Sequence, residues 1–573
     1  MKSFPVTHWH IKERPDHKDV LRLAAELNFP LPLATLLLQR GIKSAAEADL
    51  FFNPSLDDLH DPFLMRDMDK AVERIQHALG DGEKILVYGD YDVDGTTAVA
   101  LMYSYLREQG ADCEYYIPDR YKEGYGISFD GVDHAAAIGC SLIIALDCGI
   151  KSHDKVLYAK EKNIDFIICD HHRPGDTVPA AVAVLDAKRS DCNYPYDELC
   201  GCGVGFKLAQ ALQQSAGEPF EDIVKYLDLV AVAIGADIVP ITGENRILAK
   251  FGLERINAAP RPALKALFAV AGLKKKITIT DLVFTAAPRI NAAGRVDHGK
   301  GAVELLISPD AERANETAKI LNQNNIDRRD LDKTITAHAM EMIISDERFS
   351  QRKSTVVFHP DWHKGVVGIV ASRLIERWYR PTIVLTGNEG KVSGSARSVR
   401  DFDVHDAIEA CSDLLIQFGG HKYAAGLTMK PENVEAFVAK FDEQVSLRIT
   451  EEQLSPVTEV DLEISLSQID PKFVEVLKKF EPFGPGNMNP VFLTRGLADR
   501  GWAKVVGENH LKCDLLQPEN KNVHFGAIGF GLGEFLPDML KGQTFDACYT
   551  LEENVWNGMV STQMNLKDLS NGH

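Results

Sequence analysis

Three aspartates, Asp90, Asp92 and Asp94, alternate with other residues in the short stretch DYDVDG. If the chain stays extended there, side chains repeat with a period of two, and all three carboxylates lie on one side. Carboxylates that close repel one another unless cations lie between them, so the spacing predicts a metal site. A calcium-binding EF-hand begins with the same pattern, but it needs a Glu at position twelve, where this chain has Leu101. We therefore exclude the EF-hand.

Further ligands of the same kind occur at three other places in the sequence. They are Asp147 in ALDCGI (145–150), the histidines of Asp170-His171-His172, and Asp237 in AVAIGADIVPI (231–241). Asp and His without a thiolate favour Mn²⁺ or Mg²⁺ over a softer metal. Two such ions bridged by a carboxylate would activate a water and neutralise the charge that develops on a phosphoryl group. The predicted chemistry is phosphoester hydrolysis.

Two other kinds of site are excluded by spacing. The Gly-rich stretches 89–95 and 201–205 lack the GK[ST] ending of a phosphate-binding loop. Cys192, Cys200 and Cys202 cluster in the sequence, but they lack the paired CxxC spacing of a structural zinc site.

Buried strands must position these ligands. Four short apolar runs each end in an acidic residue: KILVYGD (84–90), SLIIALD (141–147), DFIICD (165–170) and AAVAVLD (180–186). Runs rich in Val and Ile without polar alternation predict strands buried on both faces, hence an α/β fold with a parallel sheet. In open sheets of this kind the ligand site lies beyond the carboxyl ends of the strands. The four acidic residues should therefore meet in one crevice.

The rest of the chain divides into further segments. Residues 310–349 keep a helical periodicity without Pro or Gly, which predicts one long helix, or two in tandem, between two domains. A second α/β segment follows, and short alternating runs from residue 457 onward predict a small β-rich domain. We expect an N-terminal helical segment at 1–48, a catalytic domain at 49–308, the connecting helix at 309–350, a substrate-binding domain at 351–450 and the β-rich domain at 451–573.

Composition limits the class of protein and its location. A chain of 573 residues should form about two to four domains. Its net charge of −20 argues against a surface covered in nucleic acid, but residues 351–400 carry nine basic and three acidic residues, a local basic segment. No apolar run reaches the length of a membrane span, and the start lacks a secretory signal. With ten scattered cysteines, these features predict a cytoplasmic protein that is not bound to a membrane.

The motifs resemble a known family. VYGDYDVDGTTA, ALDCGI, DHH and GADIVP are similar, in that order, to the four motifs of the DHH phosphoesterase superfamily, and FGGHKYAAGLTM (418–429) resembles the GGH motif of its accessory DHHA1 domain. RYKEGYGIS (120–128), PRINAAGR (288–295) and EPFGPGNMNPVF (481–492) narrow the resemblance to the bacterial RecJ family. That family implies a 5′→3′ exonuclease specific for single-stranded DNA, active in DNA repair and recombination, with a C-terminal OB-fold.

The resemblance also implies roles for the metal-site residues. Asp92, Asp94, Asp147, His171 and Asp237 would bind two divalent cations, Mn²⁺ or Mg²⁺, with Asp90 at or just outside that shell. His172 would contact the scissile phosphate, and Asp147 and His172 would be the catalytic pair.

DNA-binding residues follow from the resemblance in the same way. A 5′ phosphate would be held by Arg373, Ser395, Arg397 and His421 of the accessory domain, and by Arg120 and Arg289 of the catalytic domain. Gly419 and Gly420 would let backbone N–H groups approach the anion. In the OB-fold, Trp502, Lys504 and Lys512 are candidates, on a narrow path because residues 451–573 carry 18 acidic and 10 basic residues.

Other functions share these motifs. A nanoRNA or cyclic-dinucleotide phosphodiesterase has the same chemistry but is usually shorter, and an inorganic pyrophosphatase has no use for the third domain. A catalytically inactive DHH replication scaffold is disfavoured because the acidic motif positions are intact. For the exonuclease we expect 5′ mononucleotides as products, a monomeric chain, and a helicase and a single-strand-binding protein as candidate partners.

Overall fold

The computed structural model describes residues 7–120, 122–296, 299–556 and 558–570, so the first six residues of the predicted N-terminal segment lie outside it. The chain forms two compact units. Among the described residues, the first contains 7–45, Arg329–Lys479 and 489–570, and the second contains Ala46–Arg328 and Phe480–Met488.

A five-stranded parallel sheet, in the order β3-β2-β4-β5-β6, is the centre of the second unit. Its strands are β2 (Ile85–Gly89), β3 (Cys113–Tyr116), β4 (Leu142–Leu146), β5 (Asp165–Cys169) and β6 (Ala183–Leu185). Successive residues of β2 enter different cores, with Ile85 and Val87 in one and Leu86 and Tyr88 in the other. The sheet is thus buried on both faces, which confirms the prediction from the unalternating apolar runs.

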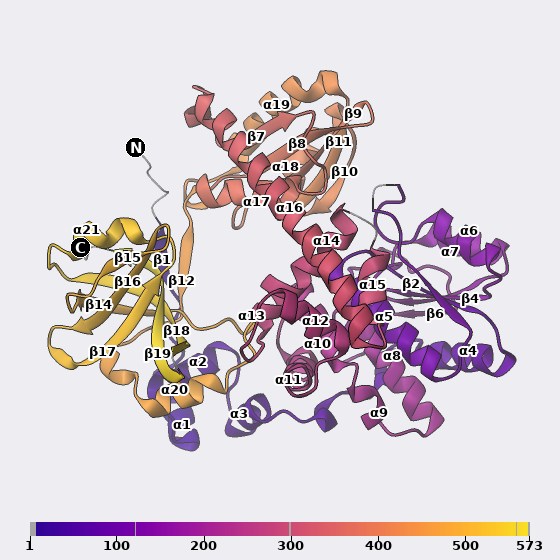
Figure 1. Ribbon diagram of the computed structural model, residues 1–573, viewed down its shortest axis with the longest axis horizontal. Helices are drawn as coiled ribbons and strands as arrows, with labels where there is room; N and C mark the ends of the chain where they lie inside the picture. The colour runs from indigo at the N-terminus through magenta and orange to yellow at the C-terminus, as the bar shows by residue number, and fades with distance from the viewer. Residues whose placement is uncertain (1–6, 121, 297–298, 557, 571–573) are drawn as a thin grey trace. The chain divides into compact units, whose positions relative to one another are not determined.

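Helices cover both faces of this sheet (Figure 1). The larger core takes side chains from α4 (Met68–Asp81), α5 (Val93–Glu108), α8 (Gly201–Ala216), α10 (Leu227–Asp237), α11 (Gly243–Ala258), α12 (Pro262–Val270) and α15 (Lys300–Leu306). The smaller core takes them from α6 (Phe129–Ala137) and α7 (His153–Glu161). The unit also holds α9 (Glu221–Val224), α13 (Ile279–Asp281), the π-helical segment Leu282–Ala286 and α14 (Ala287–Val296). It begins within α3 (Ala45–Phe52), at Ala46. The predicted long helix is confirmed as the single helix α16 (Ala311–Ser345).

The α/β part of the first unit has a mixed sheet in the order β10-β11-β9-β8-β7. Its elements are β7 (Thr355–His359), α17 (Val367–Arg377), β8 (Thr382–Asn388), β9 (Lys391–Arg397), α18 (Val404–Glu409), β10 (Leu415–His421), β11 (Ala424–Met429) and α19 (Val434–Arg448). Val384 packs on the side of α16 and α17, and the neighbouring Ile383 and Leu385 pack with α18 and α19. The antiparallel strands β9 and β10 were not predicted from the sequence.

The β-rich part of the first unit is a closed barrel. Strands β14, β18, β19, β17 and β16 pair in that order, and β16 pairs back to β14 through Ala498–Leu516. The strands are β13 (Leu462–Glu463), β14 (Phe492–Asp499), β15 (Lys504–Val506), β16 (His510–Gln517), β17 (Asn520–Gly529), β18 (Phe545–Trp556) and β19 (Met559–Ser570), with helices α20 (Pro471–Lys478) and α21 (Leu536–Met539). The predicted β-rich domain is therefore present as a five-stranded ring.

The N-terminal segment contains α1 (His17–Leu27) and α2 (Leu31–Gln39), and also a strand, β1 (His8–Ile11), that pairs in parallel with β12 (Val457–Val460). Within the described residues, no single helix is long and apolar enough to cross a membrane; α1 and α2 pass that test only as a pair, across a 113° bend. All ten cysteines are free thiols.

Candidate active site

The acidic residues predicted at strand ends do lie at one edge of the sheet. Asp90, Asp147, Asp170 and Asp186 directly follow β2, β4, β5 and β6, and these strands are parallel neighbours. Asp147 turns the chain sharply, with a left-handed φ of 59°, which Asp tolerates better than most residues. The carboxyl ends of the strands thus bring together residues that are far apart in the sequence.

The chain does not stay extended through the DYDVDG stretch. Helix α5 begins at Val93, and Asp92 is its N-cap, with Oδ1 accepting a 2.9 Å hydrogen bond from the N–H of Gly95. Asp94 therefore lies in the first helical turn, and alignment of the three carboxylates along an extended chain is wrong. The reason is local, because an Asp at the N-cap satisfies N–H groups that the helix start leaves unpaired.

A second helix start holds Asp94. The backbone N–H groups of Gly201 and Cys202, at the beginning of α8, donate to its two carboxylate oxygens at 2.6 and 2.7 Å. The first N–H groups of a helix have no partner within the helix and carry partial positive charge, so they suit a carboxylate. This support was missed from the sequence; the available signal was the Gly-rich run 201–205.

His171 is the centre of the predicted metal ligands. Its Nε2 lies 3.1 Å from Asp147 Oδ1, 3.6 Å from Asp237 Oδ2 and 3.7 Å from Asp94 Oδ2. Asp237 reaches the group from the C-terminus of α10, not from a strand. Ligand atoms of Asp94, His171 and Asp237 form one set close enough to hold an ion, and those of Asp147, His171 and His172 form another.

Several atoms of this group are buried and make no hydrogen bond in the described part of the chain. They are Asp90 Oδ2, Asp147 Oδ1 and both ring nitrogens of His171. Burial and the neighbouring carboxylates raise the pKa of Asp94 and Asp147 well above the ordinary range. Burial lowers the pKa of His171 to about 3, which leaves the neutral imidazole that binds metals. Carboxylates and a neutral imidazole with uncommitted lone pairs fit a divalent cation.

His172 has a different environment from its neighbour. Its Nδ1 lies 2.7 Å from Oδ1 of the buried Asp170, and its Nε2 lies 3.0 Å from the hydroxyl of Tyr125. Although burial lowers the pKa of His172, the hydrogen bond and charge of Asp170 raise it to about 9. His172 is therefore a cation at neutral pH, suited to a phosphate oxygen. Asp170 was predicted from the sequence to lie in the crevice, but its contact with His172 was not. Tyr125 was not predicted as a site residue, although it lies in the quoted motif RYKEGYGIS.

The remaining predicted residues of this unit lie around the centre. Burial raises the pKa of Asp90, Asp94, Asp147 and Asp237, and the charge of the half-buried Asp92 adds to this rise. The guanidinium of Arg120 lies 5.0 Å over the ring of Tyr91. Arg289, on α14, donates to Asn322 Oδ1 at 3.0 Å.

Strand register places four of the predicted phosphate-binding residues on one face of the other sheet. In one row His421 lies opposite Ala424, which lies opposite Arg397; in the next, Gly419 lies opposite Gly426, which lies opposite Ser395. Directly opposed residues share a face, as do residues two apart, so both rows face the same way. A Cβ on Gly419 would meet nothing within 4 Å, so the Gly419 end of the row that contains Ser395 has free space above it.

Gly420 and Gly368 leave no room for a side chain, because neighbouring atoms approach their backbone closely. Gly420 has a φ of 145°, and a Cβ there would lie 2.4 Å from a backbone oxygen. A Cβ on Gly368, in α17, would lie 2.9 Å from both Ser395 Oγ and Arg397 Nη2. Arg397 also donates from Nη1 to Ser395 Oγ at 3.0 Å. We call this group of Gly368, Ser395, Arg397, Gly419 and His421 the anion cradle.

Arg373 has a strong partner of its own. Its Nε and Nη2 donate to both carboxylate oxygens of Asp332, at 2.7 to 2.9 Å, and Asp332 is fully buried on α16. The structure thus commits two of its nitrogens to a bidentate ion pair, while the side chain remains 48% exposed.

Three family profiles match the chain. They are the N-terminal domain of the DHH family at residues 84–234, the DHHA1 domain at 351–447 and the RecJ OB domain at 460–568. The single-stranded-DNA-specific exonuclease RecJ of Bacillus subtilis (strain 168) is 37% identical over 564 residues, covering 98% of this chain and 70% of that protein. The protein of the same name from Escherichia coli (strain K12) is 33% identical, covering 95% and 96%. The chain belongs to the RecJ family.

Solved structures agree with this assignment. RecJ from Thermus thermophilus in complex with Mn²⁺ superposes with a TM-score of 0.84 at 29% identity, covering 99% of this chain and 80% of that one. An exonuclease RecJ bound to manganese has a TM-score of 0.60 at 34% identity, covering 69% and 97%. The candidate metal ligands from Asp90 to His171 lie within the DHH match, and Asp237 follows three residues after its end. The anion cradle lies in the DHHA1 domain and the barrel in the RecJ OB domain.

The RecJ OB domain exposes a small basic and aromatic surface. Lys504 of β15 lies directly opposite Lys512 of β16, and like charges so placed repel unless an anion lies near them. Trp502, just before β15, is 70% exposed. These three residues are the ones predicted from the sequence, and all are exposed on a mostly acidic domain.

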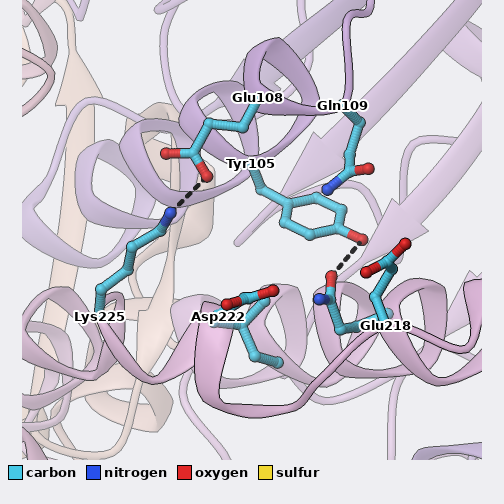
Figure 2. A pocket seen from close by; sticks show the side chains of 8 residues that line it. Tyr105, Glu108, Gln109, Glu218, Asp222 and Lys225 are labelled. Carbon is cyan, nitrogen blue, oxygen red and sulfur yellow. Dashed lines mark hydrogen bonds and ion pairs between the residues drawn. The ribbon is translucent and has the colours of Figure 1, made fainter.

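The DHH domain also has a cavity of about 280 Å³ apart from the metal ligands (Figure 2). It is lined by Tyr105, Glu108, Gln109, Gln213, Glu218, Asp222, Ile223 and Lys225. Lys225 pairs with Glu108 at 2.5 Å, and the hydroxyl of Tyr105 donates to Gln213 at 3.3 Å. Two pairs of its polar groups thus bind each other, and none of the lining residues belongs to the candidate active site.

Proposed function

We propose that this chain is a single-stranded-DNA-specific 5′→3′ exonuclease that hydrolyses phosphodiester bonds with two divalent cations, Mn²⁺ or Mg²⁺, and releases 5′ mononucleotides in DNA repair and recombination. Membership of the RecJ family supports the substrate, because relatives covering nearly the whole chain are named single-stranded-DNA-specific exonucleases. One observation carries the chemistry: His171 Nε2 lies within 3.7 Å of three carboxylates that share one buried site.

The metal ligands would be Asp90, Asp92, Asp94, Asp147, His171 and Asp237. When bound, the two cations activate a water and offset the negative charge that develops on the phosphoryl group. The protein preorganises these ligands. The amides of Gly201 and Cys202 fix both oxygens of Asp94, and burial lowers the pKa of His171 so that its imidazole stays neutral.

His172 supplies the remaining charge. It is held cationic by Asp170 and oriented from its other side by Tyr125. We propose that its Nε2–H moves from the Tyr125 hydroxyl to a non-bridging oxygen of the scissile phosphate. A hydrogen bond from a preformed and oriented cation stabilises developing charge without reorganisation.

End-dependence would come from the anion cradle. We propose that Ser395, Arg397 and His421, with the open backbone of Gly419 and the neighbouring Gly420, bind the 5′ phosphate, and that Arg373, Arg120 and Arg289 add positive charge along the strand. Forked donors of Arg match phosphate oxygens. Trp502, Lys504 and Lys512 would bind DNA in the OB domain, as stacking and basic residues do in such folds.

The expected surroundings of the enzyme complete the proposal. We infer a monomer acting in the cytoplasm, supplied with single strands by a helicase and working beside a single-strand-binding protein.

The test uses one oligonucleotide labelled at either end. The full chain, with Mn²⁺ or Mg²⁺, should release label at once from a 5′-labelled single strand and late from a 3′-labelled one, and should leave a blunt duplex intact. Asp147→Ala serves as the inactive control. Equal release from both ends, or equal degradation of the duplex, would contradict the proposal.

A further inference from the structure

One residue beside the metal centre has a backbone conformation that its side chain disfavours. Ile238 caps the C-terminus of α10 with φ 62° and ψ 25°, in the left-handed region. Helices commonly end in this conformation, but the residue there is usually Gly and sometimes Asn. A β-branched side chain in this region is an outlier, because its Cβ crowds the backbone.

The other non-glycine residues with a left-handed backbone are of a different kind. Among the described residues they are Asn28, Asp67, Asp147, Asn163, Glu389 and Asp401. All of these residues have polar side chains that are not β-branched, and Asn and Asp tolerate the left-handed region best. Among all described non-glycine residues with a left-handed backbone, Ile238 is therefore the only one that is apolar and β-branched. Strain of this kind persists where the surroundings impose it, and it clusters at functional sites.

Burial does not repay the strain at Ile238. Its side chain is 67% exposed. It directly follows Asp237, whose Oδ2 lies 3.6 Å from His171 Nε2, so its Cα lies about 3.8 Å from that of a proposed metal ligand. The preceding turn is held inside the protein, because Ala233, Ile234 and Gly235 are all buried. The helix end therefore presents an aliphatic side chain to solvent beside the metal centre.

We propose that Ile238 contacts the base of the nucleotide that flanks the scissile phosphate and so positions that phosphate at the metal centre. This rests on the proposed function, because it takes single-stranded DNA as the ligand. A strand whose phosphate lies against Asp237 and His171 brings a flanking sugar and base within reach of the next residue. An apolar side chain packs on the face of any base without reading sequence, as suits an enzyme that advances through every sequence.

The test compares two variants of the full chain with the wild type, on a 5′-phosphorylated single strand with Mn²⁺. Ile238→Asn accepts the left-handed backbone but removes the apolar surface, so its Tm should equal or exceed that of the wild type while its KM rises about tenfold and its kcat changes less than about twofold. Ile238→Leu keeps an apolar side chain and should keep KM within about threefold. Leu157→Asn, at a residue 54% exposed on α7, is the matched control and should change neither KM nor kcat.

A second measurement locates the contact on the DNA. A single abasic site is moved along the first nucleotides of the strand, and KM is measured for the wild type and Ile238→Asn. At one position the missing base should raise the wild-type KM about as much as the substitution does, and combining the two should add nothing.

The outcomes separate the two proposals. A wild-type chain that leaves the single strand intact overturns the proposed function, and this inference with it. A wild type that degrades the strand while Ile238→Asn has the same KM overturns this inference alone. A raised KM accompanied by a lowered Tm also overturns it, because Ile238 would then be structural.

Discussion

His172 Nδ1 lies 2.7 Å from Oδ1 of Asp170 at the end of β5, so that Asp170 supplies a fixed negative charge and His172 the cation that it stabilises. Asp170 is completely buried and also accepts the backbone N–H groups of Ile150, His171 and His172, so its position is fixed from several sides. The pair places a cation next to the neutral His171, and neither partner could do so alone.

Asp170→Asn should separate the charge of this pair from its position. Without the carboxylate the pKa of His172 should fall from about 9 toward its ordinary value. A raised His pKa means the cation persists up to that pH, so in the variant the alkaline loss of activity should begin at lower pH. We expect kcat/KM at pH 8 to fall about 100-fold. Steady-state pH profiles check this, with Asp165→Asn, at the opposite end of β5, as a control that should stay within about twofold of the wild type.

Asp147→Asn should affect activity and stability in opposite directions. Exonuclease activity with Mn²⁺ should fall below about 1%, because a proposed metal ligand is lost. Since burial and neighbouring carboxylates raise the pKa of Asp147, its ionised form destabilises the metal-free fold, and the variant should melt higher in EDTA. Because the folded state with a raised carboxyl pKa binds the proton more tightly, low pH neutralises Asp147 in the wild type. The difference in Tm between Asp147→Asn and the wild type should therefore shrink as the pH is lowered.

Addition of Mn²⁺ provides the matching measurement. Metal that binds only the folded wild type should stabilise it by about 2.7 kcal/mol at 100 times Kd, and EDTA should reverse this. Asp147→Asn should lose most of the shift in Tm. An equal shift in the variant would count against its role as a ligand.

Gly201→Ala should inactivate the enzyme although the position is helical. A Cβ there would lie 2.5 Å from Asp147 Cβ and 2.8 Å from its Cα, so the strand end must move. We expect activity to drop about 100-fold or more, because ångström-scale displacement of a catalytic group is costly. Gly203→Ala is the matched control on the same helix, since its Cβ would lie 3.5 Å from the nearest atom. Equal activity of the two variants would refute the argument.

Arg397→Ala should change the preference for chain ends more than the chemistry. The ratio of kcat/KM for 5′-phosphorylated over 5′-hydroxyl strands should fall about tenfold or more, because a forked phosphate contact is lost. Arg377→Ala, a half-buried residue in the last turn of α17 outside the anion cradle, should keep the wild-type ratio. The role of the anion cradle fails if Arg397→Ala leaves that ratio unchanged.

Lys504→Ala and Lys512→Ala should weaken binding of long single strands with a recognisable salt dependence. Each lost phosphate contact should reduce the slope of log K against log salt by about 0.7. Fluorescence anisotropy at several salt concentrations, with Asp147→Asn as background to prevent cleavage, measures the slope. Lys541→Ala, whose ammonium pairs with Asp538, should leave it as it was.

The first layer of this site could be inferred from the sequence because it depends on neighbours in the chain. Apolar runs that end in Asp predict buried parallel strands, and such strands place their carboxyl ends together whatever the rest of the fold does. The same locality explains an error: N-capping by Asp92 begins a helix at once, and periodicity alone gave no sign of it.

The supports of the site were decided by tertiary structure. Asp94 receives its hydrogen bond from an amide 107 residues away, and Tyr125 meets a histidine 47 residues away. In the DHHA1 domain, the pairing of β9, β11 and β10 decides that Ser395, Arg397 and His421 share a face. Residue types and local periodicity therefore determined the metal chemistry and the strand ends. Which amide, hydroxyl or guanidinium meets each ligand depends on packing between distant segments, and no local pattern carries that information.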